Sequence, residues 1–187
     1  FAPILFKASG PVEAGQIGMT VTLCNVLIAV STNWVTTRAP TFGILVAERT
    51  YGQLDNLFWR LMRVTVGVLA LGAVAIVVGV LALNVMGVPL AQRILPLGQT
   101  TIMVMATVAS AIAASLAIYL RAHKREPLAP VFLVSALLTI GLGYISAFQL
   151  GSWGVVVSYL IVAVAVQLPV SIVVFVVRRR AYHAQAQ

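Results

Sequence analysis

The sequence predicts an all-α fold, a polytopic bundle of about five transmembrane helices. Of its 187 residues, 61% are apolar and only 9% are charged, and the mean hydropathy is +1.05. Soluble globular chains carry charge on about a quarter of their residues. The few charged residues here also lie between long uncharged windows, so the chain reads as an integral membrane protein.

Four uncharged windows cover residues 14–37, 64–92, 94–120 and 127–177. Each can span a bilayer, because about 20 residues cross the hydrocarbon core. The last window is too long for one helix, and it contains Gly151-Ser152-Trp153-Gly154, a turn signal with a tryptophan that favours the membrane interface. The predicted spans, taken as a single transmembrane bundle over residues 1–187, are about 14–36, 64–88, 98–120, 129–149 and 154–177.

The first span is predicted to belong to a longer helix, about 12–48, with a kink at Pro40, since proline removes a backbone hydrogen bond and clashes with the preceding turn. Beyond it, Leu54, Leu57, Phe58 and Leu61 recur at helical spacing. This pattern predicts an amphipathic helix that either lies at the interface or leads into the second span. The first ten residues resemble the exit of an apolar helix before a Gly-Pro turn, so we expect a fragment of a longer protein.

Basic residues predict the orientation, because lysine and arginine are retained on the cytoplasmic side of short loops. Ten of the twelve fall in the first loop, the third loop and the tail, and only Lys7 and Arg93 fall on the other side. The N-terminus is therefore predicted outside and the C-terminus in the cytoplasm. The net charge of +8 is assigned to membrane topology, and no nucleic acid partner is expected.

Catalytic chemistry is not expected. No ionisable residue lies inside the five predicted spans, and neither His123 nor His183 has a cluster of possible metal ligands around it. A membrane-bound transferase would need an acid or a His-acid pair. His123 and Glu126 are the one such pair by spacing. The other candidate acids, Glu13 and Asp55, are isolated in the sequence. We predict no enzyme activity, no catalytic residue, no metal and no cofactor.

The first span carries more polar side chains than the second, and polar groups in hydrocarbon are favourable only against other helices or water. It therefore either lines an aqueous path or bonds to neighbouring helices. Arg38, at its inner mouth, either binds a pyrophosphate or anchors the topology. Near mid-membrane, Gln167-Leu168-Pro169 marks either a broken helix or a tolerated kink. The candidate residues of the substrate path are Gln16, Asn25, Thr32, Thr36 and Arg38, of which Asn25, Thr32 and Thr36 lie near one face by helical spacing.

Residues 10–63 carry a resemblance to a known family. Their Gly10-Pro11 to Gly18 stretch has the form GxxxxGQxG, and it is followed by Ala39-Pro40 and then by a small charged connection with Glu48, Arg49 and Gly52. This resembles the long helix of polysaccharide flippases in the multidrug/oligosaccharidyl-lipid/polysaccharide (MATE-like) exporter superfamily.

The resemblance implies part of the C-terminal bundle of an O-antigen type transporter in the bacterial cytoplasmic (inner) membrane. Such a protein takes part in polysaccharide biosynthesis and moves a lipid-linked oligosaccharide between leaflets by alternating access. The implied partners are the lipid bilayer, the lipid-linked oligosaccharide and a missing N-terminal bundle of the same protein.

In one respect the chain departs from the flippase pattern. Flippases are expected to present cavity arginines or lysines to the pyrophosphate, and the five spans have none, so these groups would lie in the missing N-terminal half. Two alternatives to the flippase therefore stay open. A multidrug exporter of the same superfamily would need an acidic cation site, which is equally absent from the spans. The other alternative is a membrane anchor or assembly subunit that does not transport.

Overall fold

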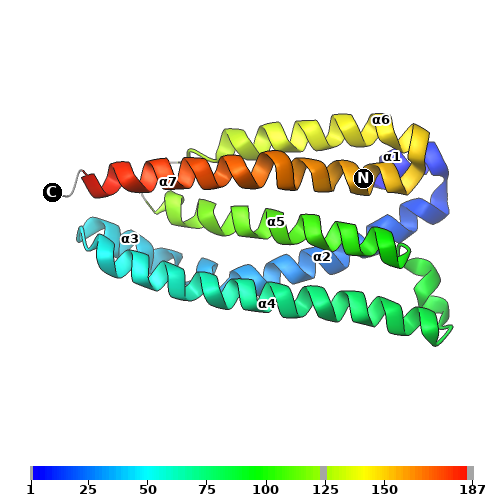
Figure 1. Cartoon of the computed structure of the whole chain (residues 1–187), viewed down its shortest axis with the longest axis horizontal. Coiled ribbons are helices and arrows are strands. Elements are labelled where there is room, and N and C mark those ends of the chain that lie inside the picture. The colour runs from blue at the N-terminus through cyan, green and yellow to red at the C-terminus, as the bar shows by residue number, and fades with distance from the viewer. Residues whose placement is uncertain (1, 123–125, 185–187) are drawn as a thin grey trace.

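The computed structural model describes residues 2–122 and 126–184, and all regular elements among them are helices, which confirms the predicted all-α class (Figure 1). The elements are α1 (Ala2–Ser9), α2 (Pro11–Thr37), α3 (Ala39–Ala47), α4 (Tyr51–Val85), the 3-10 helix η1 (Pro89–Arg93), α5 (Leu97–Arg121), α6 (Ala129–Ile161), the π-helix η2 (Val162–Gln167) and α7 (Leu168–Ala184).

Four helical segments among the described residues are long and apolar enough to cross a membrane: Pro11–Ala47, Tyr51–Val85, Leu97–Arg121 and Ala129–Arg180. The last is interrupted at Gly151, whose φ of 58° and ψ of −137° are not helical. At this break the chain reverses direction, so five lengths of helix run along the bundle (Figure 1). The chain is therefore a membrane protein by the length and composition of its helices.

The amphipathic run after the first span is the start of the second spanning helix. α4 begins at Tyr51, so the run does not form a separate interfacial helix.

The predicted kink in the first span is also present. Arg38, with φ −95° and ψ 3°, separates α2 from α3, and Pro40 lies in the first turn of α3, where its missing N–H costs no hydrogen bond.

α5 is the central helix of the bundle. It packs against α2, α4, α6 and α7, and most of its length is buried. Small side chains on α5 let the surrounding helices approach closely, as in other membrane bundles. The fully buried alanines of α5 include Ala106, Ala111 and Ala113.

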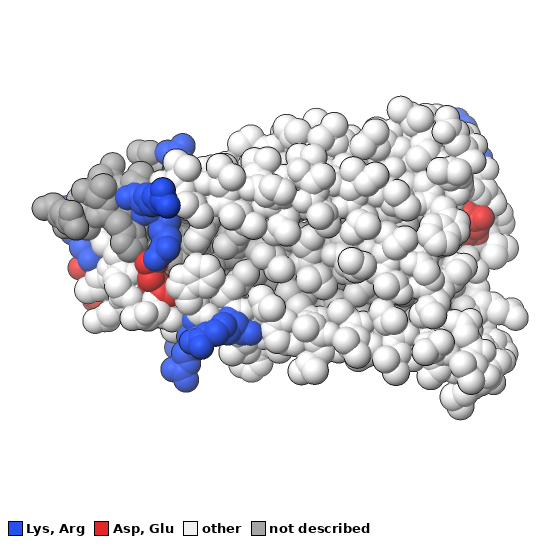
Figure 2. Space-filling view, in the orientation of Figure 1, with Lys and Arg blue, Asp and Glu red and all other residues white. Residues whose placement is uncertain are grey.

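On the face that Figure 2 shows, no charged side chain lies in the middle of the bundle, and most of the basic side chains gather toward one end. We call this the basic end; its described residues are Arg38, Arg49, Arg60, Arg63, Arg121, Arg178, Arg179 and Arg180. Lys7, Glu13 and Arg93 belong to the opposite end. The uncharged middle has the character of a surface in contact with hydrocarbon. Four residues used in the topology prediction, Phe1, Lys124, Arg125 and Gln187, lie outside the described residues.

Candidate functional site

The five candidate path residues do not gather into one pocket. Asn25, Thr36 and Arg38 are exposed on the surface of α2 and at its end, whereas Gln16 and Thr32 are partly buried. Gln16 donates from Nε2 to the backbone carbonyl of Gln92 at 2.9 Å, which ties α2 to η1 at the end opposite the basic end. Gln16 thus has a clear structural contact within this bundle.

Hydroxyl groups of α2 are satisfied within the helix itself. Each donates to the carbonyl oxygen four residues earlier, a local bond that Ser and Thr side chains can make inside helices. The energetic reason for expecting these hydroxyls to face water therefore fails, because their hydrogen bonds are already made. The hydroxyls with this bond are those of Thr20, Thr22, Ser31, Thr32, Thr36 and Thr37.

The amide groups of α2 are a different case. Asn25 and Asn33 are both exposed on α2, but Asn33 Oδ1 accepts a hydrogen bond from the hydroxyl of Thr37 at 3.3 Å, whereas Asn25 lies within the uncharged length of the helix. An amide that faces hydrocarbon without a partner costs on the order of 1–3 kcal/mol. The polar stripe on α2 consequently reduces to Asn25, with Arg38 at the basic end.

A second polar region lies inside the bundle, between α5, α6 and η2. Tyr159 donates to Ser110 Oγ at 3.2 Å, and Ser110 donates to Gln167 Oε1 at 3.2 Å. These groups border a cavity of about 380 Å³, which Ser135 and Thr139 of α6 also line. The Oγ of Ser135 is buried and has no hydrogen-bond partner among the described residues.

The Gln167-Leu168-Pro169 sequence does not break the last helix. Instead the hydrogen-bond register widens to a π-helix over Val162–Gln167, and α7 continues directly from Leu168. π-Helical segments in proteins occur frequently at functional sites. Here the wider turn ends at Gln167, the residue that accepts the hydrogen bond from Ser110.

Two carboxylates that are isolated in the sequence make long-range contacts in the structure. Asp55, only 8% exposed, accepts hydrogen bonds from Tyr119 at 2.7 Å and from Arg179. Glu13 accepts the backbone N–H of Ser152 at 3.0 Å, directly after the Gly151 break. A signal for Asp55 was available, because it lies three positions before Phe58, on the face of α4 that is buried.

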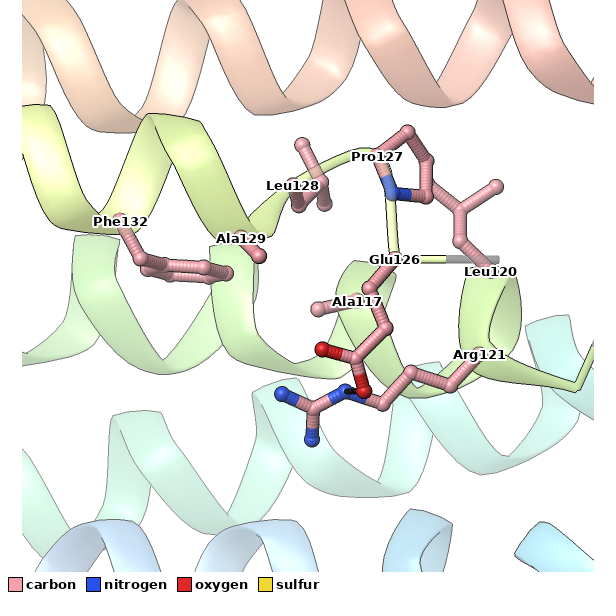
Figure 3. Close-up of a pocket in the computed structure, with 8 residues that line it drawn as sticks. All are labelled: Ala117, Leu120, Arg121, Glu126, Pro127, Leu128, Ala129 and Phe132. Carbon is pink, nitrogen blue, oxygen red and sulfur yellow. Dashed lines mark ion pairs between the residues drawn. The ribbon is translucent and has the colours of Figure 1, made fainter. Parts of the chain in front are cut away.

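Of the His-acid pair that the sequence spacing indicates, His123 lies outside the described residues. Glu126 forms an ion pair with Arg121, with 3.2 Å between Oε1 and Nε (Figure 3). In the described part of the chain there is no group of three or more His, Cys, Asp and Glu residues placed to hold a metal ion.

Comparison with known proteins gives no match: no protein family, no curated protein and no solved structure matches this chain.

Proposed function

We propose that this chain is one helix bundle of a polysaccharide flippase, which moves a lipid-linked oligosaccharide across the bacterial cytoplasmic membrane by alternating access. The observation that carries the proposal is the exposed amide of Asn25 on α2, within the uncharged middle of a membrane bundle. The substrate class comes from the GxxxxGQxG resemblance in residues 10–18.

The exposed amide of Asn25 supports a transport role because lipid is a poor environment for an amide. Asn25 is exposed at a position well inside the spanning length of α2. Such a group is stabilised when water or another helix bundle covers it. Alternating access requires a second bundle of this kind, with an aqueous path between the two.

The carboxylates give no support to a cation-coupled drug exporter. Glu13 is held by the Ser152 backbone, and Asp55 is held by Tyr119 and Arg179. Within the described residues, neither carboxylate stands free in the uncharged middle of the bundle to take a cationic drug. In this proposal the basic end faces the cytoplasm, and Arg38 there is exposed and available to a pyrophosphate.

Cysteine accessibility tests whether α2 borders an aqueous path. In a Cys24→Ala background of the intact transporter, Asn25→Cys should react with a membrane-impermeant maleimide. Val78→Cys is the matched control, because Val78 is 55% exposed on the uncharged length of α4. Val80 would be a poor control, since it is buried. Equal and low reactivity at positions 25 and 78 would remove the support for a path along α2.

Export measurements test the role of Arg38. Arg38→Ala should lose most export of the lipid-linked sugar, while Arg38→Lys should retain part of it, since lysine keeps the charge but lacks the planar fork of donors. Arg180→Ala is the control, because Arg180 is also exposed at the basic end. Full export by Arg38→Ala, at equal protein in the membrane, would reduce Arg38 to an anchor.

A further inference from the structure

A groove of about 270 Å³ runs between α2, α5 and α6 toward the basic end. Ile28 and Thr32 of α2 form one wall, Ala114 and Ile118 of α5 form the floor, and Phe132 of α6 forms the other wall. All five side chains are partly buried, so the groove is open at the surface of the bundle.

The walls of this groove suit hydrocarbon better than water. The only hydroxyl on them, that of Thr32, already donates to the carbonyl of Ile28 at 2.8 Å. A bound water needs two to four polar partners, and an apolar cavity stays dry. The cavity beside η2 differs in this respect, because it offers the buried, unpartnered Oγ of Ser135.

A cation lies at the end of the groove. Arg121 lines it seven residues after Ala114, a distance of about 10 Å along α5 at 1.5 Å per residue. Its guanidinium pairs with Glu126, but both side chains are more than half exposed, at 57% and 59% (Figure 3). Exposed pairs of this kind contribute only about 0–1 kcal/mol, so a phosphate can compete with Glu126 for Arg121.

We propose that this groove binds an anionic phospholipid from the leaflet at the basic end. One acyl chain lies along α5 between α2 and α6, and the phosphate meets the guanidinium of Arg121. The combination of an apolar groove with a cation at its mouth matches the two parts of such a lipid, and basic pockets between membrane helices are known to bind lipid headgroups. The site does not depend on the proposed transport function.

Photo-crosslinking in vesicles tests the groove. The whole chain is reconstituted with phosphatidylglycerol that carries a diazirine on its acyl chain, and the adducts are mapped by mass spectrometry. We expect adducts on the α2 peptide around Ile28 and on the α5 peptide around Ile118. Phosphatidylcholine with the same acyl chain should label these peptides at least fivefold less. Adducts distributed along α4 to the same extent, or absent from both expected peptides, would overturn the proposal.

Variants at the mouth test the role of the charge. Arg121→Gln should reduce labelling by phosphatidylglycerol at least fivefold, and Glu126→Gln should leave it unchanged or raise it, because the competing carboxylate is removed. Arg180→Gln, another exposed arginine at the basic end, should have no effect. Since Arg121 is exposed, its substitution leaves the fold intact, and unchanged labelling of Arg121→Gln would overturn the proposed headgroup contact.

Discussion

Arg179, near the end of α7, donates from Nε to Oδ2 of Asp55, near the start of α4, across 3.0 Å of space and 124 positions of sequence. The other carboxylate oxygen of Asp55 accepts the hydroxyl of Tyr119 on α5 at 2.7 Å. One carboxylate thus joins three spanning helices at the basic end. An aromatic cluster packs beside it, with 4.8 Å between the ring centroids of Phe58 and Tyr119 and 5.7 Å between those of Phe58 and Phe175.

Removal of this carboxylate is expected to destabilise the bundle. Asp55→Ala removes the carboxylate that accepts from both the hydroxyl of Tyr119 and the guanidinium of Arg179, and should lower the free energy of unfolding by about 2–3 kcal/mol. Arg179→Gln should cost less, about 1 kcal/mol, because the Arg179 side chain is 37% exposed and solvent replaces part of the interaction. Denaturant unfolding in detergent micelles measures both.

Arg178→Gln is the control for the Asp55 network, since Arg178 is exposed and adjacent to Arg179. It should leave the unfolding curve unchanged within about 0.5 kcal/mol. If Asp55→Ala were as stable as the Arg178 variant, the buried carboxylate would contribute nothing to holding α4, α5 and α7 together.

Gly151 is expected to resist substitution. Its φ of 58° and ψ of −137° lie in a region that side chains with a Cβ rarely adopt, and an added Cβ would also lie 3.1 Å from Oε2 of Glu13. Gly151→Ala should therefore cost about 1–3 kcal/mol of stability. Gly141→Ala is the matched control on the same helix, where a Cβ meets no atom within 4 Å, and it should be neutral or stabilising. Equal melting temperatures for the two variants would contradict this account of the break.

Glu13 is expected to stabilise the start of the returning helix. Its carboxylate accepts the N–H of Ser152, the first residue after the break, where a negative charge also complements the helix dipole. Glu13→Gln should lower stability by about 0.5–1 kcal/mol. Glu48→Gln, at an exposed carboxylate after α3, should leave stability unchanged. If Glu13→Gln left thermal unfolding in micelles unaltered, neither the hydrogen bond to the Ser152 N–H nor the interaction with the helix dipole would contribute to stability.

The orientation of the bundle is expected to place the basic end in the cytoplasm. In a Cys24→Ala background, Arg93→Cys should react with impermeant thiol reagents added outside intact cells. Arg49→Cys, in the connection between α3 and α4, should react only after the membrane is permeabilised. Reaction of both cysteines from outside would exclude the predicted topology.

The spanning helices, the reversal and the kink could be predicted, because each depends on the residues of one stretch of sequence. Contacts between residues far apart in the sequence could not be predicted. The uncharged windows located the spanning helices, Gly151 with Trp153 marked the reversal, and Pro40 marked the kink. The hydrogen bond between Glu13 and Ser152 joins residues 139 positions apart, so no local sequence pattern indicates it. The π-helical register before Leu168 was missed for a related reason, because packing against α5 is not visible in the residues of that segment alone.

The candidate path was predictable only in outline. Sequence spacing predicts Asn25, Thr32 and Thr36 near one face of α2, but it does not distinguish an amide from a hydroxyl that bonds to its own helix. Asn25 therefore remains a stronger candidate than either threonine. The groove between α2, α5 and α6 depends on three helices from separate parts of the chain, and no single stretch of sequence indicates it.

The contact between Glu13 and the Ser152 backbone also constrains how the protein is made. A ribosome that has synthesised α1 and α2 must add more than a hundred further residues before the partner of Glu13 exists. Until then neither Glu13 nor α1 has its contact with the region around the Gly151 break. The contacts that fasten α1 and the start of α2 to α6 can therefore form only after α4 and α5 have been synthesised.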